Sequence, residues 1–316
     1  KTVGIIGEDK QKGLTYVAEP IGVICGVTPT TNPTSTTIFK AMIAIKTGNP
    51  IIFAFHPSAQ QSSKHAAKVI LEAAIKAGAP KDCIQWIEIP SIEATKQLMN
   101  HKDIALVLAT GGSGMVKSAY STGKPALGVG PGNVPTYIEK TAHIKRAVND
   151  IIGSKTFDNG MICASEQVMV VDKEIYSDVV KEFKLHQTYF VNKNELQQLE
   201  DAIMNEDKTA VKPDIVGKSA VDIAKLSGIS VPEKTKLLVA EIDGIGKDYP
   251  LSREKLSPVL AMVTAKSTRH ALQICEDTLK FGGLGHTAVI HTEDSQLQQK
   301  FGLKMKACRV LINTPS

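Results

Sequence analysis

Short runs rich in Val, Ile and Leu alternate along the chain with longer segments whose apolar residues recur at helical spacing. This alternation is typical of parallel strands joined by helices that cover the sheet. In the first part of the chain the expected strands are 21–27, 51–55, 84–87, 106–109 and 126–129, and the expected helices are 35–46, 59–77, 92–100 and 115–120. The first 140 residues or so therefore predict a doubly wound α/β sheet.

A second series of the same kind follows Pro135. Its expected strands are 168–171, 237–240, 259–263, 288–291 and 310–312, and its expected helices are 142–154, 176–183, 268–279 and 296–303. The polar stretches 193–218 and 241–255 are interpreted as surface connections. We therefore predict two doubly wound α/β domains, residues 20–135 and 136–316.

The opening segment has a different pattern. In residues 2–18, two short apolar runs flank a polar turn that ends at Gly13, which predicts a β-hairpin. A lone hairpin is marginally stable in water, so it must pack on its own domain or on a neighbouring subunit. We favour the neighbouring subunit and interpret residues 1–19 as an oligomerisation element.

Composition and charge exclude several classes of protein. The chain has 42% hydrophobic and 22% charged residues, which is ordinary for a soluble globular protein. The net charge of +5 is spread along the chain and aromatic residues make up 5%, which argues against a nucleic-acid-binding surface. No apolar run approaches the ~18 residues of a membrane span, and no secretory signal opens the chain. Lys1 lies in a strand-like stretch, so we expect an internal portion of a longer protein.

The five cysteines are far apart and lack the C-x-x-C spacing of a zinc site. They are Cys25, Cys83, Cys163, Cys275 and Cys308. An odd number of scattered cysteines predicts reduced thiols in a cytoplasmic protein, without a disulfide framework or a metal site.

One cysteine stands out by its position. Residues 156–167 place Cys163 on a bend marked by Asp158, Asn159 and Gly160, directly ahead of an apolar run. A thiol at a chain reversal can face a cleft and be positioned by backbone N–H groups, and a nucleophile needs exposure and a lowered pKa. A cysteine is also a common inert core residue. The bend favours the nucleophile, and the residues alone leave both readings open.

Three glycine-rich loops follow predicted strands, at 111–114, 128–133 and 282–286. None is a complete G-x-G-x-x-G fingerprint, so each by itself is more typical of a tight turn. The first lies between a strand and a helix, where backbone N–H groups can bind a pyrophosphate.

Three polar side chains lie at loop ends next to predicted strands. Asn32 follows the first strand, where ligands bind in open α/β sheets, and its amide can donate to an oxyanion or serve as a helix N-cap. Glu254 and His286 precede later strands and are equally compatible with ordinary surface groups.

Together these segments resemble the aldehyde dehydrogenase superfamily, in particular its coenzyme A (CoA)-acylating branch and the N-terminal half of bifunctional aldehyde-alcohol dehydrogenases. The likeness is carried by residues 18–26, 30–36, 157–167 and 254–258. It implies an NAD-binding domain in residues 20–135, incomplete at its N-terminus, and a catalytic domain in residues 136–316, incomplete at its C-terminus.

The resemblance also implies roles for single residues. Cys163 matches the nucleophile, and Asn32 matches the asparagine that shares the oxyanion hole with the backbone N–H of that cysteine. His286 matches a histidine of the acylating branch, which would accept the CoA thiol proton or gate access. The cofactor contacts that it implies are Thr30, Thr31, His56, Pro57, Gly111, Gly112, Gly130, Glu254 and Leu256.

Two positions depart from the hydrolytic members of the superfamily. His56 stands where those enzymes hold the adenine ribose with a lysine, which leaves NAD against NADP open. Their general-base glutamate lies in a Glu-Leu-Gly-Gly motif, and the matching stretch 128–132 has no carboxylate. General-base assistance is typically worth about 10²–10⁴-fold, so its absence favours CoA over water as the acyl acceptor.

The resemblance therefore implies reversible oxidation of acetaldehyde by NAD and CoA to acetyl-CoA, through a thioester on Cys163. The alternatives are a hydrolytic aldehyde dehydrogenase, a phosphate-linked semialdehyde reductase, or an assembly module of a filament-forming enzyme. The implied partners are a small aldehyde or acyl-CoA, further copies of the chain in a homodimer or higher assembly, and a fused iron-dependent alcohol dehydrogenase domain.

Overall fold

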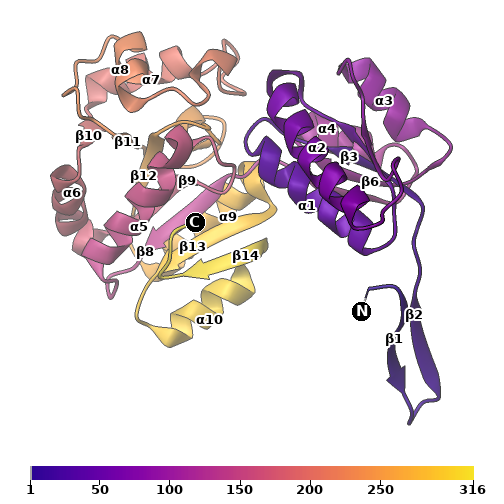
Figure 1. Ribbon diagram of the computed structural model, residues 1–316. Helices are drawn as coiled ribbons and strands as arrows, with labels where there is room; N and C mark the ends of the chain where they lie inside the picture. The colour runs from indigo at the N-terminus through magenta and orange to yellow at the C-terminus, as the bar shows by residue number, and fades with distance from the viewer. Residues whose placement is uncertain (1) are drawn as a thin grey trace. The chain divides into compact units, whose positions relative to one another are not determined.

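The computed structural model describes residues 2–316 and divides the chain into two compact units, one ending at Gly130 and the other spanning Pro131–Ser316 (Figure 1). The boundary predicted from sequence follows residue 135. Each unit contains a parallel sheet with helices on both faces. The prediction of two doubly wound α/β folds is confirmed.

The first unit is built on a five-stranded parallel sheet in the order β5-β4-β3-β6-β7. Its strands are β3 (Val23–Val27), β4 (Ile51–Ala54), β5 (Ile84–Trp86), β6 (Ile104–Thr110) and β7 (Ala126–Val129). Helices α1 (Pro33–Lys46) and α2 (Gln60–Lys76) pack on one face, and α3 (Ile92–Asn100) and α4 (Ser113–Tyr120) on the other. A short 3₁₀ turn, η1 (Pro57–Ala59), links β4 to α2.

The predicted hairpin is present in the same unit. Strands β1 (Gly4–Asp9) and β2 (Leu14–Ala18) pair antiparallel. Asp9 Oδ1 accepts the backbone N–H groups of Gln11 and Lys12 in the turn, and Gly13 closes it with φ of +65°. Both strands expose large apolar side chains, namely Ile5, Ile6, Leu14, Tyr16 and Val17.

The second unit is built on a seven-stranded parallel sheet in the order β10-β11-β12-β9-β8-β13-β14. Its strands are β8 (Val134–Ile138), β9 (Glu166–Asp172), β10 (Thr188–Val191), β11 (Leu237–Glu241), β12 (Val259–Ala265), β13 (Gly285–His291) and β14 (Ala307–Ile312). Its helices are α5 (Ile144–Thr156), α6 (Tyr176–Leu185), α7 (Lys193–Ile203), α8 (Ala220–Leu226), α9 (Thr268–Thr278) and α10 (Ser295–Lys304). Short helical turns are η2 (Phe157–Gly160), η3 (Lys173–Ile175), η4 (Pro213–Ile215), η5 (Pro250–Ser252) and the π-helical η6 (Leu279–Gly283).

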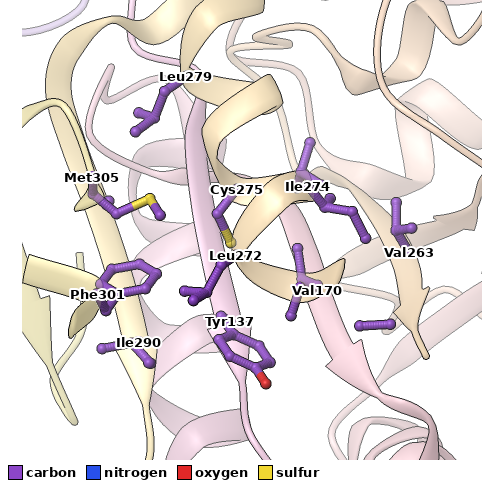
Figure 2. Close-up of a cluster of buried hydrophobic side chains, with 14 of the residues drawn as sticks. Tyr137, Val170, Val263, Leu272, Ile274, Cys275, Leu279, Ile290, Phe301 and Met305 are labelled. Atoms are coloured by element: carbon purple, nitrogen blue, oxygen red, sulfur yellow. The ribbon is translucent and has the colours of Figure 1, made fainter. Parts of the chain in front are cut away.

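The core of this unit has apolar layers on both faces of the sheet. Helices α9 and α10 cover one face, where Figure 2 shows the Tyr137 ring of β8 beside Leu272 and Cys275 of α9. Helices α5 and α6 cover the other face. Because both faces of β9 are buried, all of its residues from Glu166 to Asp172 are inaccessible to solvent, and the strand gives the segment before it a rigid end.

The prediction that the stretches 193–218 and 241–255 are only surface connections is wrong. Within 193–218 lies α7, which begins with a capping box between Asn192 and Glu195 and buries Leu199 and Ile203. In the stretch 241–255, Lys255 is fully buried. Polar composition conceals α7, because a helix with one narrow apolar stripe is mostly polar by count. It conceals the burial of Lys255 because lysine is usually exposed to solvent.

Across residues 2–316, no helix combines the length and the apolar character that crossing a bilayer requires.

Candidate active site

The cysteine loop begins with a left-handed turn. After α5, the residues Asp158, Asn159 and Gly160 have φ of +48°, +51° and +71°. A Cβ at Gly160 would lie 2.6 Å from the carbonyl oxygen of Ser257 and 2.9 Å from that of Lys155, so only glycine fits. The side-chain amide of Asn159 donates to the carbonyl of Gly217 at 2.9 Å. The bend expected at this place is therefore present and is fixed by neighbouring backbone.

Three predicted site residues of the second unit, Cys163, Glu254 and His286, converge on Gly132. A Cβ at Gly132 would lie 1.9 Å from the carbonyl oxygen of Cys163 and 3.3 Å from Nδ1 of His286. The backbone N–H of Gly132 donates to Oε1 of Glu254 at 2.8 Å. Cys163, Glu254 and His286 come from sequence positions far apart, and the missing side chain of Gly132 is what lets them meet.

Asn133 anchors the Gly132 loop. Its amide donates to the carbonyls of Ser252 at 2.9 Å and Thr278 at 3.1 Å, and the residue is almost fully buried. Gly283 packs on it so closely that a Cβ there would lie 2.4 Å from the nitrogen of Asn133. In the third glycine-rich loop, Gly283 therefore lets the backbone pack closely against Asn133. No role was predicted for Asn133 from the sequence, where its only signal is that it ends the second glycine-rich loop, 128–133.

The thiol of Cys163 does not have the lowered pKa expected of a nucleophile. Burial raises its pKa, and the nearby carboxylate of Glu254 raises it further. The backbone N–H of Cys163 itself and the guanidinium of Arg309 act in the opposite direction. The sequence expectation is wrong here because the fold buries the thiol and also brings the carboxylate of Glu254 close to it. At neutral pH the thiol of Cys163 is therefore protonated, and forming the thiolate requires an additional favourable charge or hydrogen bond.

Glu254→Gln is expected to lower the pKa of Cys163, because it removes a like charge while an amide oxygen can still accept the Gly132 N–H. Burial raises the pKa of Glu254 to about 7, so the difference should appear above about pH 7, where the wild-type carboxylate is charged. The measurement is the rate of iodoacetamide alkylation against pH, followed on the Cys163 peptide by mass spectrometry.

The matched control for this variant is Glu174→Gln, which neutralises a carboxylate that pairs with Lys140. It should leave the alkylation profile in place. A profile of Glu254→Gln that coincides with the wild type, or lies at higher pH, would contradict the electrostatic role of Glu254.

A buried polar layer supports the segment that carries Glu254. The ammonium of Lys255 donates to the carbonyls of Gln167 at 3.1 Å and Leu251 at 2.7 Å, and its backbone N–H donates to Oε1 of Gln167 at 3.0 Å. Lys155 donates to the same Oε1 at 3.2 Å, and burial lowers its pKa to about 7. The burial of these two lysines was not predicted from the sequence, because lysine is usually exposed to solvent.

Leu256 forms the tight turn beyond this layer. Its φ is +45°, a strained conformation for a leucine, and its carbonyl accepts the N–H of Gly217 at 3.0 Å. The structure therefore gives Leu256 a backbone role in the turn that follows Glu254.

Asn32 occupies the N-cap position of α1 without capping it. Its side chain makes no hydrogen bond to the first turn, where Pro33 lacks an N–H. Its Oδ1 accepts the hydroxyl of Thr31 at 3.2 Å, and its amide nitrogen has no acceptor among residues 2–316. The side-chain N–H groups of Asn32 are therefore available to a ligand. Asn32 belongs to the first unit and Cys163 to the second, so their shared oxyanion hole stays a prediction.

The other predicted cofactor contacts share one edge of the first unit. They follow the carboxyl ends of four parallel strands, with Thr30 and Thr31 after β3, His56 and Pro57 after β4, Gly111 and Gly112 after β6, and Gly130 after β7. This is the edge at which open α/β sheets bind ligands. Gly112 caps α4, and a Cβ there would meet no atom within 4 Å, so the first N–H groups of α4 are open to an anion.

The side chain of His56 is already engaged. Its Nδ1 accepts the backbone N–H of Ser58 at 3.2 Å, which caps η1. Pro57 starts that turn, as a proline does at a first helical position. His56 therefore supports the turn by the cofactor edge, and its contact with a cofactor stays a prediction.

Residues 2–227 match the sequence profile described as "Aldehyde dehydrogenase family". The chain belongs to the aldehyde dehydrogenase family. It is 56% identical to the aldehyde-alcohol dehydrogenase of Streptococcus pneumoniae serotype 4, covering 100% of this chain and 37% of that protein. It is 50% identical to the bifunctional aldehyde-alcohol dehydrogenase of Escherichia coli K12, covering 100% of this chain and 36% of that protein. The chain thus spans little more than a third of these curated relatives.

Solved structures of the aldehyde dehydrogenase family agree with this fold. An acetylating aldehyde dehydrogenase from Geobacillus thermoglucosidasius has a TM-score of 0.95 and 48% identity, covering 100% of this chain and 69% of that one. A propionaldehyde dehydrogenase from Rhodopseudomonas palustris, solved with bound CoA and an acylated cysteine, has a TM-score of 0.86 and 31% identity, covering 94% and 67%. The family and the fold inferred from the sequence motifs are both confirmed.

Proposed function

We propose that this chain is the catalytic core of a CoA-acylating aldehyde dehydrogenase. It oxidises a small aldehyde such as acetaldehyde with NAD, holds the acyl group as a thioester on Cys163, and transfers it reversibly to CoA. The observation that carries the proposal is the meeting of Cys163, Glu254 and His286 at Gly132, in a loop without a general-base carboxylate. The acetylating and CoA-bound relatives support the same acceptor.

The nucleophilic step belongs to Cys163. Its thiolate adds to the aldehyde carbon, and the resulting oxyanion is held by the Asn32 amide and the backbone N–H of Cys163. NAD, if bound, would supply the hydride acceptor for this oxidation, and the acyl group would remain as a thioester on Cys163. The open N-terminus of α4 at Gly112 and the carboxylate of Glu254 would hold the pyrophosphate and the nicotinamide ribose.

The choice between CoA and water as acyl acceptor depends on whether a carboxylate near the thioester can act as a general base. In the stretch 128–132 there is no acidic side chain, and Oε1 of Glu254 is occupied by the Gly132 N–H. A water molecule near the thioester then lacks the general base that hydrolytic members of the family carry in this stretch, whereas a thiol ionises far more readily than water. The thioester therefore persists until CoA arrives.

The decisive experiment is NADH formation from acetaldehyde by the full-length protein, with CoA present and with CoA withheld. We expect sustained turnover with acetyl-CoA as product only when CoA is present. Equal rates without CoA and acetate as product would indicate a hydrolytic enzyme, and a requirement for phosphate would indicate a semialdehyde reductase. Parallel assays with NADP decide the cofactor preference.

Asn32→Ala is expected to lower turnover by about 10²-fold while leaving NAD affinity nearly unchanged. The physical reason is that a preorganised oxyanion donor acts mainly on the transition state. Steady-state kinetics and NAD titration measure the two effects separately. Asn100→Ala, which removes an exposed asparagine at the end of α3 in the same unit, is the control and should keep wild-type turnover. Wild-type turnover of Asn32→Ala would remove Asn32 from the mechanism.

We also propose that the β1–β2 hairpin joins copies of the chain in a homo-oligomer, because its exposed apolar side chains cover both strands. The relatives' names and lengths support a fusion to an alcohol dehydrogenase domain. From the resemblance, we propose that this domain is iron-dependent and that the protein is cytoplasmic. Light scattering of the full-length protein, with and without the hairpin, tests the assembly independently of catalysis.

A further inference from the structure

Thr287 places a buried hydroxyl between His286 and Arg309. Its Oγ1 lies 3.0 Å from Nδ1 of His286 and 3.3 Å from Nε of Arg309, and the residue is 1% exposed. Thr287 and Arg309 are direct partners in the register of β13 and β14. Two backbone strands therefore fix the arrangement of His286, Thr287 and Arg309.

The direction of the hydrogen bonds follows from what each group can do. A guanidinium only donates, so Oγ1 of Thr287 accepts from Arg309. The hydroxyl hydrogen of Thr287 is left for Nδ1 of His286, because residues 2–316 provide it no other acceptor. A neutral imidazole that accepts at Nδ1 carries its proton on Nε2. The buried hydroxyl thus selects one tautomer of His286.

The charges around His286 favour its neutral form. From β14, Arg309 reaches the hydroxyl of Thr287 beside it, and the Cys308 thiol donates to the main-chain carbonyl of His286. Gly132, whose N–H binds Glu254, lies beside Nδ1 of His286 and the main-chain carbonyl of Cys163. Burial lowers the pKa of His286, and the positive charge of Arg309 lowers it further. After burial, Arg309 is the charge that acts on the imidazole, and it favours the neutral form.

We infer that Thr287 and Arg309 are positioning residues that hold His286 as a neutral imidazole with its proton on Nε2. His286 then serves acyl transfer as a hydrogen-bond donor and not as the base that removes the CoA proton. This inference rests on the proposed function. In the transfer, the CoA thiol loses its proton to water, its sulfur bonds to the acyl carbon, and Cys163 leaves as the thiolate. The Nε2–H stabilises negative charge on oxygen or sulfur during this exchange.

Solid-state ¹⁵N NMR of the full-length protein labelled with ¹⁵N-histidine tests the tautomer directly. The signals of His286 are those absent from the spectrum of His286→Gln. At neutral pH we expect an unprotonated Nδ1 and a protonated Nε2 in the wild type and in Thr287→Ser, and a mixture of tautomers in Thr287→Val. A protonated Nδ1 in the wild type overturns the inference, whether or not Thr287→Val folds.

Rapid-mixing kinetics give the second readout. Thr287→Val should slow the CoA-dependent release of the acyl group by about tenfold, the typical effect of one lost hydrogen bond, and Thr287→Ser should restore it. The NADH burst without CoA should be unchanged in both variants. Equal acyl transfer by Thr287→Val and the wild type also overturns the inference. A wild type that forms no acyl-CoA refutes the proposed function instead, and the NMR result still decides the tautomer.

Discussion

Cys163→Ala is expected to abolish acyl-CoA formation, with a loss of at least about 10⁴-fold, because no other group can carry the acyl intermediate. The substitution deletes one sulfur atom from a half-buried side chain and leaves the backbone turn at Gly160 untouched. The protein should therefore fold normally. The measurements are the NADH burst without CoA, steady-state acetyl-CoA production, and thermal unfolding.

Cys83→Ser is the control for this variant, because Cys83 is a partly buried thiol in the other unit. It should keep the burst and the turnover, whereas Cys163→Ala should lose both at an unchanged unfolding temperature. Acetyl-CoA production by Cys163→Ala near the wild-type rate would refute the nucleophile and with it the proposed mechanism.

Gly132→Ala is expected to lower turnover by about 10²-fold or more, although it changes no chemical group of the site. Its Cβ would stand 1.9 Å from the carbonyl oxygen of Cys163, so the cysteine loop must move. A misplacement of about 1 Å at a reacting group can cost about 10²-fold in rate, and overpacking should destabilise the fold by about 1–3 kcal/mol. Steady-state kinetics and denaturant unfolding measure the two losses.

Gly302→Ala is the matched control, because a Cβ at this position in α10 meets no atom within 4 Å. Alanine is preferred over glycine in a helix by about 1 kcal/mol, so this variant should be at least as stable as the wild type and equally active. A Gly132→Ala protein with wild-type kinetics would show that the cysteine loop tolerates displacement.

Much of the architecture was predictable from local patterns. The predicted runs 51–55, 168–171 and 259–263, which lie in or overlap β4, β9 and β12, are continuously apolar, as is typical of strands buried on both faces. The helix α7 was missed although Asn192 and Glu195 form a capping box, because its polar composition outweighed that signal. The boundaries of strongly apolar elements are thus easier to read than those of amphipathic surface helices.

The candidate site was predictable as a set of residues and not as an arrangement. Cys163, Glu254 and His286 were found from local motifs, and nothing local indicates that they meet at Gly132. The effects of neighbouring charges on the pKa values of Cys163 and His286 were equally unpredictable from local sequence. Arg309 lies on the last strand and influences Cys163 and His286 only because β14 pairs with β13.

The sequence alone determined the alternation of strands and helices, the glycine-marked bend before β9 and the family motifs, because hydrophobic period and backbone freedom are properties of neighbouring residues. Only the tertiary structure decided the raised pKa of Cys163, the burial of Lys155 and Lys255, and the hydroxyl link from Arg309 to His286. Electrostatic and hydrogen-bond effects depend on distances of a few ångströms between residues on different elements of the chain, and folding alone sets those distances.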